Sequence, residues 1–267
     1  MSEFLDNLLV KWTPRFSALR RLPGVGAMAH RISYRVLSPD RLVWYQVRQG
    51  PAHDLWLKLR LRTGADCYNG AVEPALQEVL AKHIRPGMIF YDLGANIGFF
   101  SLLAARLVGA EGKVFSFEAD PEVADRLQGN AERNGFTNIR VIRRAVWSFS
   151  GSVPFSRVNT SQSPDRGCGK VVPLSAAERT IEIGCVSLDD FVRNESAPHF
   201  IKCDVEGAES EVFRGALGLL AERKPLLACE VHSNENRSQV TQILEILHYS
   251  LDWFTSNHVL AIPPKSS

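Results

Sequence analysis

The sequence predicts an α/β protein built on a mostly parallel sheet with helices on both faces. Apolar segments of strand length alternate with amphipathic segments of helix length from residue 73 to residue 248, which is the pattern of a doubly wound sheet. The 267 residues are 45% hydrophobic and 22% charged, which fits a globular chain and excludes a disordered or collagen-like one. This length suits one large domain with an appendage.

The appendage is expected over residues 1–68. The first 40 residues read as helical pieces broken by prolines. Residues 41–68 read as strands, chiefly the two strands 41–47 and 55–62 of a hairpin, the second with period-two alternation. Residues 1–62 hold 11 basic and four acidic residues, a balance of 11 − 4 = +7. An anionic partner and a solvated helical surface both fit this charge, and we favour the surface because apolar residues separate the basic ones.

From residue 73 onward, helices and strands are expected to alternate. The segment after residue 98 places Phe99, Leu103 and Leu107 on one helical face. Asp120 is a typical N-cap, and Pro121 is a typical first residue of a helix. The predicted elements are helix 73–83, strand 88–93, a helix to residue 108, strand 113–117, helix 121–134 and strand 139–146.

Residues 156–179 interrupt the alternation. They are rich in Ser, Gly, Pro and Asn, which predicts a long loop with at most one short strand or helix. Beyond them, Val212, Phe213 and Leu220 share one helical face. The predicted elements are strand 200–204, helix 208–222, strand 226–231, helix 237–248 and two short strands at 251–255 and 258–262.

The sharpest motif is the turn that follows the strand ending at Leu93. Asp92, Gly94 and Gly98 precede a helix, and glycines there allow a tight turn and close approach of a ligand to the backbone. Asn96 stands where dinucleotide-binding folds have a middle glycine. An aspartate before the turn disfavours a phosphate and suits a cationic ligand such as S-adenosylmethionine.

A second acidic residue, Glu118, ends the next strand, 20 residues beyond Gly98. An acidic side chain at this point and spacing can accept hydrogen bonds from both ribose hydroxyls of a nucleoside. The alternative is a surface glutamate unrelated to a site. The two motifs in strand–turn–helix–strand order favour nucleoside binding.

Two later strands end in polar residues. Lys202 and Asp204 share a strand face, and we interpret them as a polar wall of the site, with a structural ion pair from Lys202 to Glu206 or Glu230 as the alternative. Glu230 and His232 end the following strand. His232 is equally well explained as a general base for a hydroxyl and as a core histidine.

Metal binding is not expected. The five cysteines are scattered without a Cys-x-x-Cys pair, so neither a zinc site nor a disulfide framework is indicated. Asp204, Glu230 and His232 remain an alternative set of ligands for a divalent cation. The absence of a clear ligand cluster predicts activity that survives a chelator.

Four segments together resemble the FkbM-type S-adenosylmethionine-dependent methyltransferases. They are Asp92-Leu-Gly-Ala-Asn-Ile-Gly, Phe117-Glu-Ala-Asp, Ile201-Lys-Cys-Asp-Val-Glu-Gly-Ala-Glu and Cys229-Glu-Val-His. The resemblance covers about residues 68–250. It implies a class I methyltransferase (Rossmann-like) fold with a mostly parallel seven-stranded sheet over residues 69–267, preceded by the basic helical and hairpin cap of residues 1–68. It also implies O-methylation of a sugar or secondary metabolite.

The resemblance also implies roles for individual residues. S-adenosylmethionine would be held by Asp92, Gly94, Ala95, Asn96, Gly98, Glu118, Ala119, Ala145 and Asp204. Asp204 would face the methyl-transfer site. From the residues themselves we expect three catalytic residues, His232, Asp204 and Lys202: His232, or a carboxylate beside it, accepts the hydroxyl proton, and Lys202 stabilises a developing oxyanion. We also expect the acceptor to meet Glu73, Glu206 and Glu230, and the loop 156–179 and the N-terminal region to select it.

Three alternatives stay open: an RNA methyltransferase, a nicotinamide-dependent oxidoreductase and a cofactor-binding scaffold without catalysis. We expect no nucleic-acid partner because no aromatic-basic stripe is visible. The longest apolar run is too short to span a bilayer, and the N-terminus lacks a signal-peptide pattern. We therefore expect a cytoplasmic enzyme, and a homodimer is left open.

Overall fold

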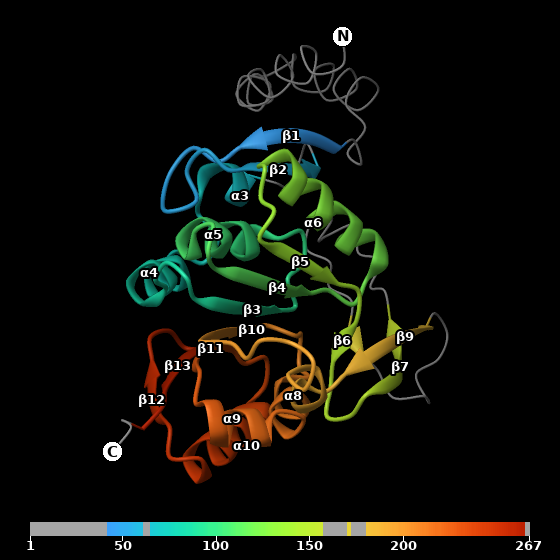
Figure 1. Cartoon of the computed structure of the whole chain (residues 1–267), viewed down its shortest axis with the longest axis vertical. Coiled ribbons are helices and arrows are strands. Elements are labelled where there is room, and N and C mark those ends of the chain that lie inside the picture. The colour runs from blue at the N-terminus through green and yellow to red at the C-terminus, as the bar shows by residue number, and fades with distance from the viewer. Residues whose placement is uncertain (1–41, 61–64, 157–169, 172–179, 265–267) are drawn as a thin grey trace, which may run out of the picture.

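A seven-stranded sheet forms the centre of the computed structural model (Figure 1), which describes residues 42–60, 65–156, 170–171 and 180–264. The strand order is β12-β13-β11-β10-β3-β4-β5, and only β13 runs antiparallel to its neighbours. The predicted mostly parallel seven-stranded sheet is thereby confirmed. Its strands are β3 Ile89–Leu93, β4 Lys113–Phe117, β5 Ile139–Ile142, β10 Phe200–Cys203, β11 Leu226–Glu230, β12 Ser250–Trp253 and β13 His258–Ile262.

Helices cover both faces of this sheet (Figure 1). Successive strand residues point to opposite faces, so Phe90 joins the core with the first group of helices and Tyr91 joins the core with the second. The first group is α4 Pro74–His83, α5 Phe99–Val108 and α6 Pro121–Arg133, and the second is α7 Leu188–Phe191, α8 Glu209–Arg214, α9 Leu217–Arg223 and α10 Asn234–Ile246. Among the described residues, no helix is both long and apolar enough to cross a bilayer.

The predicted hairpin consists of β1 Leu42–Gln46 and β2 Trp56–Arg60, which pair antiparallel. Its second strand, β2, is tied to α6, because the amides of Trp56 and Lys58 donate to the side chains of Asn134 and Asn130, each at 2.8 Å. The expected strand character to residue 68 is wrong, since Ala65–Asn69 forms the short helix α3. The hairpin shares its core with α4 and α5, and the boundary at residue 68 stays a prediction. The helices expected over the first 40 residues lie outside the described residues.

The predicted strand 139–146 is wrong in extent. The chain bends after Ile142, where the amide of Arg144 donates to the Ile142 carbonyl at 2.9 Å. Ala145 and Val146 then leave the main sheet and pair in parallel with β9. They belong to a second sheet of order β6-β9-β7-β8, which the sequence analysis missed. Its strands are β6 Ala145–Val146, β7 Gly151–Ser156, β8 Lys170–Val171 and β9 Thr180–Val186. The predicted loop 156–179 therefore includes β8 and the last residue of β7, Ser156. The rest of the predicted loop lies outside the described residues.

The predicted helix 208–222 is two helices, and Asp189 accounts for the break. The Gly215 carbonyl accepts from the Asp189 amide at 2.9 Å, so it turns away from the helix axis. The Asp189 carboxylate then accepts from the amides of Gly218 at 3.0 Å and Leu219 at 2.7 Å, which caps the start of α9. A long-range side chain therefore divides a segment whose local pattern is continuous.

Gly94→Ala is expected to destabilise the fold strongly. Gly94 has φ +73°, and an added Cβ would lie 1.7 Å from the Asp204 carbonyl oxygen, so two strand ends would have to separate. We expect a loss of about 2–4 kcal/mol in the free energy of unfolding, measured with urea. Gly129→Ala is the matched control, because a Cβ there meets nothing within 4 Å inside α6. Equal stability of the two variants would contradict this account of the turn.

Candidate active site

The candidate site lies where the strand order of the main sheet reverses. β4 and β10 flank β3 on opposite sides, and the carboxyl ends of parallel strands at such a point form a ligand-binding crevice. A solvent-open cavity lies there, lined by residues at the ends of β3, β4 and β10. The predicted site residues that line it are Gly94, Asn96, Glu118, Ala119, Ala145, Asp204 and Glu206.

The Glu118 carboxylate is held by the turns beside it. Its two oxygens accept from the amides of Asn96 at 2.8 Å and Asp120 at 2.9 Å, and the side chain is almost fully buried. Burial raises the pKa of Glu118 to about 7, against the opposing effect of these hydrogen bonds. Each carboxylate oxygen keeps further acceptor capacity toward the cavity, which is what a ribose diol requires.

Asp92 is placed differently from the expectation that it contacts the cofactor. Its carboxylate is fully buried and does not line the cavity. It accepts from the Ser101 hydroxyl at 2.6 Å and lies 3.2 Å from the Lys202 ammonium. Asp92 therefore supports the turn from behind. Ala95 and Gly98 also stand outside the cavity lining, and they shape the turn and the start of α5.

Lys202 is a buried cation, 3% exposed, with three oxygen neighbours. Its ammonium lies 3.2 Å from Asp92, 3.4 Å from Asp204 and 3.1 Å from the Gly94 carbonyl, to which it donates. The alternative pairing with Glu206 or Glu230 is not found. The two carboxylates outweigh the effect of burial and raise the pKa of Lys202. The side chain thus joins the ends of β3 and β10.

His232 lies beside the cavity and is oriented by a buried carboxylate. Its Nδ1 lies 2.7 Å from Glu209 Oε1, and its Nε2 lies 3.7 Å from Asp204 and 3.6 Å from Glu206. Glu209 is fully buried, so Nδ1 carries the proton and Nε2 faces the site. The hydrogen bond to Glu209 is the main cause that raises the pKa of His232 to about 9. This is the base-and-orienter arrangement of general-base sites.

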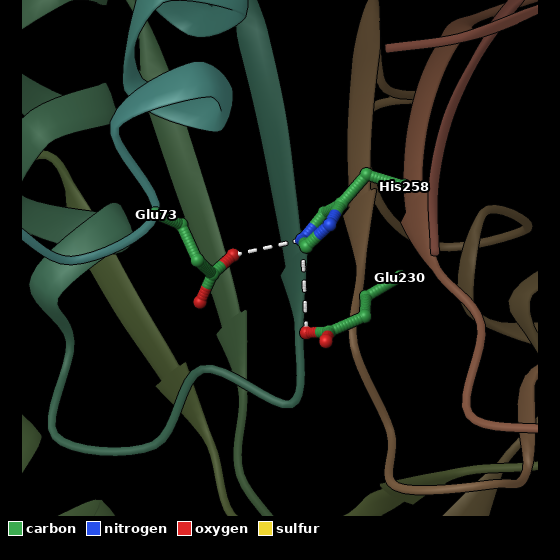
Figure 2. Close-up of side chains that lie close together, drawn as sticks. All are labelled: Glu73, Glu230 and His258. Carbon is green, nitrogen blue, oxygen red and sulfur yellow. Dashed lines mark hydrogen bonds and ion pairs between the residues drawn. The ribbon is translucent and has the colours of Figure 1, made fainter. Parts of the chain in front are cut away.

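Glu73 and Glu230, expected at the acceptor site, lie in a neighbouring cluster with His258. His258 Nε2 lies 3.1 Å from Glu73 and 3.7 Å from Glu230 (Figure 2). Glu230 Oε1 is also 3.9 Å from His232 Nε2, so the cluster adjoins the candidate base. Burial raises the pKa of Glu230, and the charges of Asp204 and Glu73 raise it further.

Sequence reasoning missed the cavity wall opposite Glu118. Arg144, Phe155 and Val171 line the cavity from the second sheet and the bend that leads into it. A period-two signal was present, because Val153 and Phe155 are the buried residues of β7. His258 was also missed as a polar residue, because its segment reads as an ordinary apolar strand.

The mostly parallel sheet, with helices on both faces and a cavity at its switch point, defines a Rossmann-like α/β fold. The model of the methyltransferase FkbM domain matches residues 92–253, more than half of the chain. The chain therefore belongs to the FkbM methyltransferase family. This match confirms the family that the motifs indicated.

Two curated relatives and one solved structure give the range of similarity. The hexuronic acid methyltransferase AglP of Haloferax volcanii is 30% identical over 158 residues, which cover 58% of this chain and 61% of AglP. A protein-L-isoaspartate O-methyltransferase of Methanococcoides burtonii is 36% identical over 59 residues, 22% of this chain and 29% of that one. The chain thus spans less than two thirds of either relative. The crystal structure of methyltransferase FkbM from Methylobacillus flagellatus aligns with a TM-score of 0.48 and 22% identity, over 69% of this chain and 49% of that one.

Proposed function

We propose that the protein transfers a methyl group from S-adenosylmethionine to a hydroxyl of a sugar or other small-molecule acceptor. The observation that carries the proposal is the pairing of Glu209 with His232 beside a cavity that Glu118 closes on the other side. One end suits a ribose and the other suits removal of a hydroxyl proton. The similarity to AglP, whose name assigns it a hexuronic acid, makes an acidic sugar the first acceptor to test.

Glu118, Ala119 and Ala145 are proposed to hold the nucleoside part of the cofactor, with Gly94, Asn96 and Asp204 around the methionine part. When bound, S-adenosylmethionine supplies the methyl group from its sulfonium, and the remaining S-adenosylhomocysteine is a neutral thioether. Asp204 would face the positive charge, and Asp92 and Lys202 would fix the turn from behind. We assign Lys202 this positioning role in preference to oxyanion stabilisation, because its ammonium already has three oxygen neighbours.

His232 is proposed to accept the proton of the acceptor hydroxyl at Nε2 while the acceptor oxygen forms its bond to the methyl carbon. Glu209 keeps Nδ1 protonated and the ring oriented, as in other base-and-orienter pairs. Positive charge bound beside Asp204 opposes protonation of His232, and this frees Nε2 as a base. Glu206 is exposed enough at the same edge to meet the acceptor.

Mass spectrometry of candidate acceptors tests the proposed function. The purified chain is incubated with S-adenosylmethionine and separate panels of hexuronic acids, neutral sugars, phenolic metabolites and RNA. A gain of about 14 daltons on a hexuronic acid or another hydroxyl compound supports the proposal. Methylation of the RNA panel alone would favour the RNA methyltransferase, and no product with any panel, together with binding of NAD, would favour an oxidoreductase.

Cofactor affinity should depend on pH through Glu118. Ribose hydroxyls donate best to an ionised carboxylate, so a proton on Glu118, whose pKa is about 7, competes with binding. We expect S-adenosylhomocysteine to bind about tenfold or more weakly at pH 5.5 than at pH 8.5, with the change centred near 7. Glu118→Gln should bind weakly at both pH values. Calorimetry in which the variant keeps the wild-type pH dependence would remove Glu118 from this role.

A further inference from the structure

Three residues that are far apart in the sequence converge beside the candidate active site. Glu73 precedes α4, Glu230 ends β11 and His258 begins β13, where it is the cross-strand partner of Glu230. One atom of each lies within 4.8 Å of the others, and Figure 2 shows the two carboxylates reaching the imidazole from different sides. Neighbouring ligands of a metal ion at about 2.0–2.3 Å lie about 3–3.5 Å apart. The 3.1 Å from His258 Nε2 to Glu73 falls within that range, and the 3.7 Å to Glu230 lies just beyond it.

The second nitrogen of His258 is fixed by its own neighbours. Asn257 donates through Nδ2 to Glu230 Oε1 at 2.6 Å, which turns its Oδ1 toward His258 Nδ1 at 3.1 Å. The Thr255 hydroxyl lies 2.9 Å from the same nitrogen. Asn257 Oδ1 can only accept, so this contact favours a proton on Nδ1, and in that tautomer the lone pair of a neutral imidazole lies on Nε2. Metal-binding histidines are commonly oriented by this kind of contact.

The surroundings of Nε2 favour a proton or a metal ion at this nitrogen. His258 is 8% exposed, and its Nε2 faces the carboxylates of Glu73 and Glu230. A lone pair against two carboxylates is repulsive, so either a proton or a metal ion must stand at Nε2. Glu73 also keeps a left-handed backbone, φ 40° and ψ 65°, at the start of α4. Such conformations in residues other than glycine persist mainly where the surrounding structure or a function demands them.

We propose that Glu73, Glu230 and His258 form a site for a divalent cation. Carboxylate oxygens suit a hard divalent ion such as Mn²⁺, and one imidazole nitrogen can complete this set of ligands. A divalent ion offsets both carboxylate charges, whereas a proton on His258 offsets one. The proposal departs from the sequence expectation that no metal is bound, and it uses different ligands from the set of Asp204, Glu230 and His232. Given the proposed function, the ion would lie where it can coordinate an oxygen of the acceptor and favour ionisation of a hydroxyl.

Binding of Mn²⁺ to the full chain tests the site without any methyl acceptor. The protein is dialysed against a chelator, freed of it and titrated with Mn²⁺, and free Mn²⁺ is followed by electron paramagnetic resonance. We expect one saturable site whose affinity falls at least about tenfold in Glu73→Gln and in Glu230→Gln. Glu78→Gln is the matched control, because Glu78 is an exposed glutamate in α4, the helix that begins directly after Glu73.

The outcomes of this titration show whether a metal ion or a proton occupies the position at His258 Nε2. No saturable binding to the wild type would overturn the proposal and leave a proton on His258 Nε2 between the two carboxylates. Binding that is equal in the wild type and both ligand variants, or that Glu78→Gln weakens as much, would also overturn it. Melting curves show whether each variant is folded. Binding of S-adenosylhomocysteine, measured on the same samples, distinguishes failure of this site from failure of the proposed function.

Discussion

His232→Ala should lower turnover by about 10²–10⁴-fold, the usual contribution of a positioned general base. The imidazole lies between the buried Glu209 and the cavity edge at Asp204, so its removal deprives the acceptor hydroxyl of the proposed base. Affinity for S-adenosylhomocysteine should change little, because the proposed ribose and methionine contacts belong to the ends of β3 and β4.

Turnover per folded molecule and the melting temperature are measured on the same preparation. His83→Ala is the control, because His83 is at the far end of α4 from Glu73. A His232 variant that melts earlier but keeps near-normal turnover per folded molecule would show that the residue has only a structural role.

Lys202→Met should lower the free energy of unfolding by about 3–5 kcal/mol, the cost of leaving a buried charge without its partner. Asp92 is fully buried, and Lys202 is its nearest cation at 3.2 Å. The methionine retains most of the apolar volume of the lysine stem, so lost packing contributes little. Urea unfolding at neutral pH measures the effect.

The double variant Asp92→Asn, Lys202→Met separates the effect of the unpaired Asp92 charge from the effect of lost packing at Lys202. An asparagine can still accept from Ser101, which now donates to Asp92 at 2.6 Å, and it brings no uncompensated charge. We expect the double variant to recover at least half of the lost stability. If it is as unstable as Lys202→Met alone, the ion pair is not the reason for the destabilisation.

The sequence predicted the parts of the fold that local patterns determine. β4 was placed at its observed residues, and Asp120 accepts from the Glu122 amide at 2.9 Å, as expected of an N-cap. The position of such an element is determined mainly by its own apolar residues and by the turn beside it, and depends little on distant contacts. The same motifs placed Glu118 and Asp204 at one sheet edge, because parallel strands end together.

The remaining features depend on contacts between distant residues. β6 has two residues and exists through its pairing with β9, about 40 positions later, so a local pattern could not separate it from β5. Lys202 pairs with Asp92, more than 100 positions away, as well as with Asp204, whereas the alternative partners considered from the sequence were Glu206 and Glu230. Glu73 meets His258 across 185 positions. No motif spacing reports a contact of that kind.

A crystal structure with S-adenosylhomocysteine tests the central claim most directly. The account predicts ligand density in the cavity at the ends of β3, β4 and β10. The ribose hydroxyls should lie on the Glu118 carboxylate, the adenine near Ala145, and the sulfur toward Asp204 and His232. Ligand bound in another part of the molecule, or a ribose held by a carboxylate other than Glu118, would contradict it.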